Sequence, residues 1–278
     1  MTPPTTPKSG VSEEIEKAIA HRDRPPRPNA LRASLTFGWR ALLKIKHVPE
    51  QLFDVTLFPV MFTLLFVLLF GGAIAGSTKE YVQFLAPGVM VQTVIFITMY
   101  TGMGLNTDIQ KGFFDRIKSL PIWQPSAIVG ALLGDLLRYG VASSIVIALT
   151  LILGFRPEGG PLGVIAGFAL VLLFCFCFTW VWTVLGLLMR TPTSVLNTSM
   201  MILFPLTFAS NIFVPPDTLP SWLEWFVGVN PISHLVDATR SLMAGDPDGS
   251  AIGQVFIYCV VLLAVFAPIT MKLYRSKT

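Results

Sequence analysis

Six long stretches of this chain contain no Asp, Glu, Lys or Arg, and they constrain its fold more than any other feature. A helix that crosses the hydrocarbon core of a bilayer needs about 20 apolar residues, with a range of about 17–25. Each stretch therefore has room for one crossing, and none has room for two. The charge-free stretches are 55–78, 81–107, 139–155, 159–189, 191–216 and 249–271.

The composition leads to the same conclusion. Only 13% of the residues are charged and 53% are hydrophobic, whereas soluble domains carry about 25% charged residues. We therefore exclude an ordinary soluble enzyme, a secreted disulfide scaffold and a disordered chain, and we predict an all-α membrane protein. Cys175, Cys177 and Cys259 lie within apolar stretches, so we expect them to be small buried hydrophobic residues.

We expect six transmembrane helices, with counts of five and seven left open. The third stretch is the shortest, at 17 residues, and it crosses only if its helix extends back past Arg138 towards Leu132. Arg138 would then snorkel from the helix end and pair with Asp135 one turn earlier. The spans are expected at about 53–76, 83–106, 133–155, 161–187, 193–213 and 250–272, within a membrane domain at 51–275.

The distribution of Lys and Arg predicts the orientation in the membrane. Sixteen of the 20 basic residues lie on one side of the expected spans: before the first, between the second and third, between the fourth and fifth, or after the sixth. Lys79, Arg156 and Arg240 lie on the opposite side. Because basic residues gather on the cytoplasmic side of membrane proteins, we expect both termini to be cytoplasmic. Residues 1–30 are rich in Pro and charge, which predicts a disordered cytoplasmic tail without a cleavable signal peptide.

Residues 31–50 contain the pattern of a basic amphipathic helix. Apolar residues recur at helical spacing, and a neighbouring stripe is polar. Such a helix lies in the headgroup layer with its cations on lipid phosphates; the alternative is a short soluble helix packed on the rest of the protein. The apolar stripe is Leu31, Leu35, Trp39 and Leu42, and the polar stripe is Arg32, Thr36, Arg40 and Lys44.

A cytoplasmic segment at 108–121 connects the second and third spans. It mixes charged and aromatic residues, whereas a passive connector needs only a few polar residues. The segment fits either a docking site for a partner protein or an interfacial helix anchored by its aromatic side chains, and the pattern alone leaves both open. The residues that define it are Lys111, Phe113, Phe114, Asp115, Arg116 and Lys118.

Two short helices are expected at 217–245, before the last span. At about 1.5 Å per residue neither can cross a bilayer, so we expect re-entrant helices at the outer face. Asp237 and Arg240, one turn apart in the second helix, can form an ion pair. The expected capping residues are Ser221 and Glu224, a capping box for the first helix, and Asn230, Pro231 and Gly245 for the second.

Signatures of catalysis and metal binding are missing from the sequence. No Gly-Lys dipeptide occurs, so the chain has no Walker A phosphate loop. The three His residues are scattered, which argues against a metal site. We therefore expect that the chain is not an enzyme and binds neither a cofactor nor a metal by itself.

Uncharged polar residues gather around the fifth span. Together with the Phe and Met residues nearby, they could bind a lipophilic solute that has a few hydrogen-bonding groups. The alternative is that they form hydrogen bonds between helices. We take Asn197, Thr198 and Asn211 as candidate residues of a substrate path.

Four stretches of the sequence together carry a family resemblance. They are LFDVTLFPVMF (52–62), GSTKEYVQFLAPGVM (76–90), MYTGMGLNTDIQKGFFDRIKSLPIWQPSAIVG (99–130) and SNIFVPPDTLPSWLEWFVGVNPISHLVDATRSLMAG (210–245). In these stretches the chain resembles the permease subunits of ABC-2-type exporters, most closely the daunorubicin/doxorubicin-resistance type of actinobacteria. The resemblance implies six spans, a cytoplasmic amphipathic helix, a coupling element at 108–121 and extracellular re-entrant helices.

The resemblance also implies partners. It implies two copies of a separate ABC ATPase subunit that binds ATP and Mg²⁺ and contacts the coupling element. It implies a second permease, most simply a homodimer, in a bacterial plasma membrane. The basic residues then face membrane lipid rather than nucleic acid.

The function that the resemblance implies is export of an amphipathic drug or antibiotic, such as an anthracycline, along a path formed by spans one, two and five. A second hypothesis is an exporter of a lipid, glycolipid or polyketide. A third is a non-transporting membrane module that serves as an anchor or sensor.

Overall fold

The structure is a computed structural model of the chain, and it describes residues 29, 32, 34–39, 57, 60–69, 78–113, 126–214 and 220–277. Regular structure within these residues is helical, without strands. Residues 34–39 and Val60–Leu69 form two short helical pieces. The longer helices are α4 (Thr78–Gln110), α6 (Ser126–Ile152), α7 (Gly160–Leu188), α8 (Pro192–Phe208), α9 (Ser221–Val229), α10 (Pro231–Ala244) and α11 (Gly249–Lys277).

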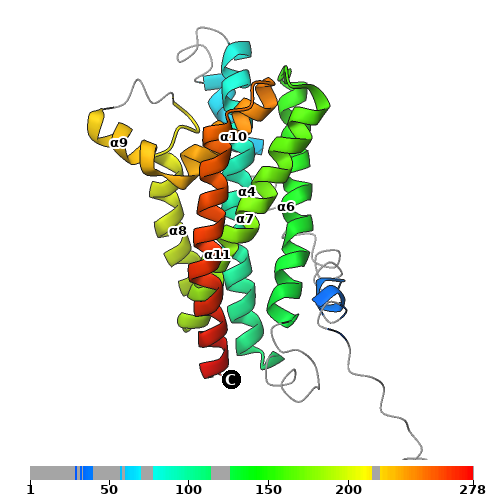
Figure 1. The fold of residues 1–278 in the computed structure, drawn as a ribbon, viewed down its shortest axis with the longest axis vertical. Coiled ribbons are helices and arrows are strands. Elements are labelled where there is room, and N and C mark those ends of the chain that lie inside the picture. Colours follow the sequence, from blue (N-terminus) through cyan, green and yellow to red (C-terminus); the bar gives the residue numbers. More distant parts are fainter. Residues whose placement is uncertain are drawn as a thin grey trace, which may run out of the picture.

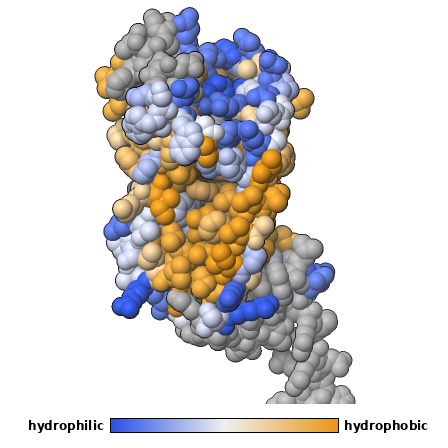
Figure 2. All heavy atoms as spheres, turned by 60° about the vertical axis from the view of Figure 1, so that its left-hand side comes forward, coloured by the Kyte–Doolittle hydropathy of each residue, from blue (hydrophilic) through white to orange (hydrophobic). Residues whose placement is uncertain are grey.

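Four of these helices, α4, α6, α7 and α11, are long and apolar enough to cross a membrane. They run along one direction together with α8, and α9 and α10 lie near the upper end (Figure 1). α6 has 27 residues and is therefore about 40 Å long, which exceeds the roughly 30 Å hydrocarbon core of a bilayer. Figure 2 shows an apolar band between two hydrophilic ends. The predicted all-α membrane architecture is confirmed.

The expected spans correspond to helices in chain order. The second, fourth and sixth fall within α4, α7 and α11. The third overlaps α6 but was placed later in the chain, since α6 begins at Ser126 and ends at Ile152, and the fifth falls on α8. Of the first span, only residue 57 and Val60–Leu69 are described, and of the tail expected at 1–30 only residue 29. The count of six crossings stays a prediction.

α4 is the central helix and contacts α6, α7, α8 and α10. Its crossing with α7 is made by glycines: a Cβ added at Gly186 would lie 2.5 Å from the carbonyl oxygen of Gly102, and one at Gly102 would overlap the carbonyl of Trp182. Small residues let membrane helices approach backbone to backbone. The α4–α7 contact therefore depends on the absence of side chains at these two positions.

The capping prediction for α10 is confirmed. The side chain of Asn230 accepts a hydrogen bond from the amide of Ile232, Pro231 opens the helix, and Gly245 ends it with φ of +85°. The predicted capping box of α9 is wrong. The carbonyl of Pro220 accepts from the amides of Leu223 and Glu224 at 2.8 and 3.0 Å, so the preceding residue already caps α9 and Ser221 is its first helical residue.

The two ends of the bundle hold different segments (Figure 1). The lower end, as drawn there, holds residues 34–39, the starts of α6 and α8, and the ends of α4, α7 and α11. The upper end holds α9, α10 and the turn between α6 and α7, where the amide of Gly159 donates to the carbonyl of Met243 at 2.9 Å. Of the described Lys and Arg residues, six belong to the segments at the lower end: Arg32, Lys111, Arg190, Lys272, Arg275 and Lys277.

Candidate coupling and transport sites

The start of the expected coupling segment lies at the lower end of α4. Gly112, with φ of +66°, ends the helix in a conformation that favours glycine. Lys111 is exposed, and Phe113 is half-buried. The ring of Phe113 meets the ring of Phe37 edge to face, with centroids 6.3 Å apart. The other residues predicted for coupling, Phe114, Asp115, Arg116 and Lys118, lie outside the described residues.

Residues 34–39 pack on α6 through their small side chains. Ser34 and Gly38 are buried, and a Cβ added at Gly130 of α6 would clash with the Cβ of Phe37 and lie 2.7 Å from the carbonyl oxygen of Ser34. Leu35 and Trp39 instead point outward, 59% and 64% exposed. A soluble helix packed on the protein would bury its large apolar residues, so this arrangement favours the interfacial interpretation. Arg40 and Lys44 lie outside the described residues.

The lower end of α4 also holds the turn between α7 and α8. The buried amide group of Asn106 donates to the carbonyls of Gly186 and Met189 at 2.9 and 2.8 Å. One turn further on, the side chain of Gln110 donates to the carbonyl of Arg190 at 2.7 Å. These bonds satisfy carbonyls that α7 leaves open at its end. The end of α4 is therefore bonded to the end of α7 and to the turn that precedes α8.

A buried polar cluster joins α4, α6 and α7 near the middle of the bundle. Asp135 and Arg138 form an ion pair with 3.0 Å between oxygen and nitrogen. The hydroxyl of Thr101 donates to the same carboxylate. Tyr139 bridges Thr101 at 3.1 Å and Thr179 at 2.9 Å. We call these five residues the mid-bundle cluster.

The expectation that Arg138 snorkels from a helix end is wrong. α6 begins at Ser126, so Arg138 lies in mid-helix, is 8% exposed and donates to the carbonyl of Ile97 at 3.4 Å. The predicted pairing with Asp135 is confirmed. Ionisable residues inside a membrane are costly and are associated with function. The sequence shows that Asp135 and Arg138 are one turn apart, but it does not show that they lie near the middle of their helix.

A second polar cluster lies at the upper end and joins α10 to the chain beyond α8. The predicted pair of Asp237 and Arg240 is present at 3.1 Å. Asn211 donates to Asp237 at 2.6 Å, and Arg240 donates to the carbonyls of Asn211 at 3.2 Å and Phe84 at 3.3 Å. The guanidinium carbon of Arg240 also lies 4.1 Å from the centroid of the Phe84 ring, a cation–π contact. We call this group the upper cluster.

The surroundings of Asp237 in the upper cluster affect the ionisation of its carboxyl group. Burial raises the pKa of the Asp237 carboxyl, and the neighbouring Arg240 guanidinium and the Asn211 amide act against that shift. The carboxylate therefore depends on both neighbours to hold its charge. Asn211 is a structural partner of α10 in this arrangement.

The three predicted path residues do not come together within one chain. Asn197 is exposed and Thr198 is half-buried on α8, whereas Asn211 is buried beyond the end of that helix. Asn197 and Phe208, the last residue of α8, are about 16 Å apart along the axis. The exposed face of α8 carries Asn197, Met201, Phe204 and Phe208 at helical spacing. We call this face the α8 stripe.

Comparison with known proteins identifies the family. Residues 33–244 match the profile described as "ABC-2 type transporter". The chain belongs to the ABC-2 transporter family. The match covers residues 34–39, α4 and the helices from α6 to α10, which are the elements that build both ends of this permease.

Individual relatives are permeases too. The chain is 48% identical over 98% of its length, and 95% of the relative's length, to the daunorubicin resistance ABC transporter permease protein DrrB1 of Streptomyces coeruleorubidus. It is 26% identical over 73% of its length, and 71% of the relative's, to a transport permease named ycf38 from Cyanophora paradoxa. It is 25% identical over 65% of its length, and 62% of the relative's, to the doxorubicin resistance permease DrrB of Mycobacterium tuberculosis.

The family assigns a general role to the chain. An ABC-2 permease is the membrane subunit of an ABC transporter, in which a separate subunit is the ATPase.

Proposed function

We propose that this permease exports an amphipathic, drug-like compound, such as an anthracycline, with energy supplied by a separate ATPase. The observation that carries the proposal is the 48% identity, over nearly the whole of both chains, with a permease named for daunorubicin resistance. An identity that extends over 98% of this chain includes the coupling segment and the helices of the candidate path. The cargo class of that relative is therefore the first one to test.

The working assembly in this proposal has two permeases and two ATPase subunits in a bacterial plasma membrane. ATP and Mg²⁺ bind to the ATPases. The Lys/Arg-rich lower end faces the cytoplasm, where both termini lie and where residues 108–121 meet the ATPase. The α8 stripe supports a homodimer, because its large apolar side chains Met201 and Phe204 are 80% and 54% exposed within the described part of one chain.

The proposed transport step begins at the coupling segment. Closure of the ATPases pushes on residues 108–121 and, through Phe113 and Phe37, on the interfacial helix. The end of α4 moves with the segment, and the bonds of Asn106 carry that movement to the start of α8. The permease then alternates between two conformations that differ in how far the α8 stripe is exposed to the transport path. Binding of nucleotide to the ATPases shifts the equilibrium between these two conformations.

One experiment tests both the partner and the cargo. The tagged full-length permease is isolated from its native membrane in mild detergent, placed in lipid nanodiscs and assayed for a co-purified P-loop protein and for ATP hydrolysis. We expect daunorubicin to stimulate hydrolysis and a glycolipid of the same membrane to have no effect. We expect Asp115→Ala combined with Arg116→Ala to abolish that stimulation.

Each rival function gives a different result in this assay. Stimulation by the glycolipid alone would replace the drug with a lipid cargo. A permease that is isolated without an ATPase, under conditions that keep other membrane complexes intact, would favour the anchor or sensor function. A normal response in the Asp115→Ala, Arg116→Ala variant would show that coupling uses other residues.

The homodimer has its own test. The three native cysteines are buried, so a single cysteine introduced by Met201→Cys reports on the α8 stripe alone. We expect oxidation to yield a covalent dimer from this variant. Val260→Cys, on the exposed face of α11, is the matched control and should stay monomeric; dimers from both variants in equal yield would contradict the proposed interface.

A further inference from the structure

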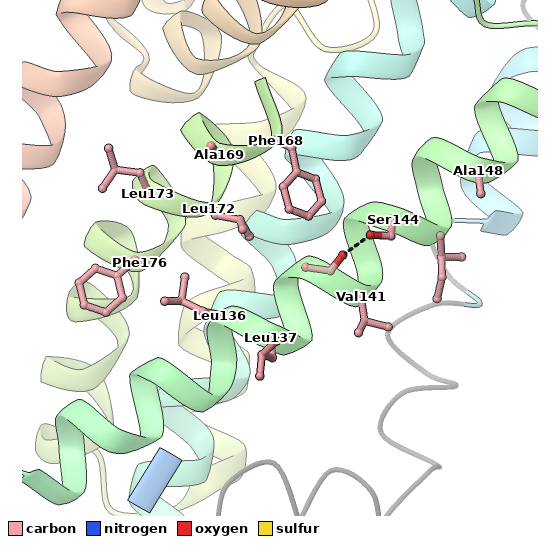
Figure 3. A pocket seen from close by; sticks show the side chains of 12 residues that line it. Leu136, Leu137, Val141, Ser144, Ala148, Phe168, Ala169, Leu172, Leu173 and Phe176 are labelled. Carbon is pink, nitrogen blue, oxygen red and sulfur yellow. Dashed lines mark hydrogen bonds between the residues drawn. The ribbon is translucent and has the colours of Figure 1, made fainter. Parts of the chain in front are cut away.

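A groove separates the middle parts of α6 and α7 on the outer surface of the bundle (Figure 3). Its volume is about 890 Å³, near the upper end of the roughly 300–1,000 Å³ range of small-molecule sites. Leu137 and Val141 of α6 and Leu173 of α7 line it and stay well exposed. The groove is thus open along its length towards the surroundings of the bundle.

The lining of the groove is almost free of polar groups. Ser144 is its one residue with a polar side chain, and that hydroxyl already donates to the carbonyl of Gly140 at 2.8 Å (Figure 3). The groove spans positions 136–148, which include the midpoint of the 27-residue helix α6. At that depth a charged or strongly hydrogen-bonding ligand would lose its water without finding a partner.

The described part of the first apolar stretch packs elsewhere. Phe62 lies 6.1 Å from Phe208 and 5.9 Å from Phe213, and Phe66 lies 4.4 Å from Phe213, between ring centroids. These contacts place Val60–Leu69 against the end of α8. Within the described part of the chain the groove is therefore open to an apolar molecule from the membrane.

Below the groove lies the proposed interfacial helix. A Cβ added at Gly38 would lie 3.7 Å from the Cβ of Leu133, and Leu137, one turn above Leu133, already lines the groove. Arg32 and Trp39 of the same segment are exposed, and this combination of a cation and an indole is typical of the headgroup layer. The exposed cation and indole thus lie next to an apolar groove whose first lining residue, Leu136, is about 4.5 Å above Leu133 along α6.

We propose that the groove binds one acyl chain of an anionic phospholipid from the cytoplasmic leaflet, whose headgroup lies at the level of Arg32 and Trp39. The bound chain fills the space between α6 and α7 at the depth of the mid-bundle cluster. The site is separate from transport, since its occupancy requires neither an ATPase nor cargo.

Photolabelling tests the proposal. The full-length permease is reconstituted in vesicles of phosphatidylethanolamine and phosphatidylglycerol, with a trace of phosphatidylglycerol that carries a diazirine within an acyl chain. After illumination, the adducts are mapped by mass spectrometry. We expect residues such as Val141 and Leu173 to be labelled several-fold more than Val260 and Val261 on the exposed face of α11.

Matched variants identify the site. Ala148→Trp and Ala169→Trp fill the groove from α6 and α7, at positions that are already exposed, and together they should remove the excess labelling. Ala264→Trp, at an exposed position of α11, should leave it unchanged. A zwitterionic phosphatidylcholine probe should label the groove several-fold less than the anionic one.

Three results would overturn the proposal. Equal labelling of the groove and of α11 would mean that the groove only meets bulk lipid. Labelling of the groove below that of α11 would mean that protein covers it. Loss of the label at saturating daunorubicin would make the groove a drug site.

Discussion

The ring of Phe37 meets the ring of Phe113 edge to face, with centroids 6.3 Å apart and planes at 86°. This contact joins the helix at residues 34–39 to the first residues of the expected coupling segment. Both also border the cluster of buried residues that contains Leu105, Ile128 and Trp180. The first residues of the segment therefore contact both the helix at 34–39 and the buried core of the lower end.

The first prediction concerns this aromatic pair. Phe37→Ala and Phe113→Ala should each reduce drug-stimulated ATP hydrolysis several-fold, because aromatic pairs contribute about 0.5–1.5 kcal/mol beyond their burial. In a double-mutant cycle, the second substitution should add little to the first. Phe256→Ala, on the exposed face of α11, is the control; strictly additive losses would show that the two rings act independently.

The second prediction concerns the mid-bundle ion pair. Asp135→Leu leaves Arg138 charged and unpaired at mid-membrane depth, and the loss of one partner of a buried pair costs about 3–5 kcal/mol. The double variant Asp135→Leu, Arg138→Met should be markedly more stable than the single one. Thermal unfolding in detergent measures both, and a double variant less stable than Asp135→Leu would contradict this electrostatic account.

The third prediction concerns the crossing of α4 and α7. Gly186→Ala places a Cβ 2.5 Å from the carbonyl oxygen of Gly102, so the helices must separate, at a cost of about 1–3 kcal/mol. Gly104→Ala is the matched control, because its Cβ meets nothing within 4 Å. The unfolding temperature and the yield of protein in the membrane should fall for Gly186→Ala and not for Gly104→Ala. Equal values for the two variants would contradict the close backbone contact.

The fourth prediction concerns the link between α4 and α8. Asn106→Ala removes two hydrogen bonds to the end of α7, and a buried group that loses its partner costs about 1–3 kcal/mol. We expect basal ATP hydrolysis to persist while its stimulation by drug falls several-fold. Gln110→Ala, which removes one bond at an exposed position, should have a smaller effect, and the reverse order would contradict the proposed route.

Much of the helical framework was predictable, because the cost of burying charge confines Asp, Glu, Lys and Arg to the ends of spans. The same reasoning failed at α6. The charge-free stretch begins only after Arg138, so the third span was expected to start at about residue 133, whereas the apolar residues before Asp135 continue the helix back to Ser126. Two oppositely charged side chains can lie in the middle of a membrane helix when they form an ion pair. The other polar members of the mid-bundle cluster come from α4 and α7 as well as α6, so the sequence of α6 alone does not reveal the site.

Local signals were more reliable than long-range ones. Asn230, Pro231 and Gly245 define α10 through contacts within a few residues, and the sequence therefore predicts them. The contact between Gly102 and Gly186 joins positions 84 residues apart, and no local pattern reveals it. For the same reason, the separation of Asn197 from Asn211 became visible only when the faces of α8 were known.

Drug transport itself tests the central claim most directly. Inverted membrane vesicles that contain the permease and its ATPase would be given daunorubicin with ATP or with a non-hydrolysable analogue. We predict ATP-dependent accumulation of the drug, lowered several-fold by Asn197→Trp and unchanged by Ser144→Trp on the outward face of α6. Vesicles that hydrolyse ATP but accumulate a membrane lipid and no drug would contradict the account.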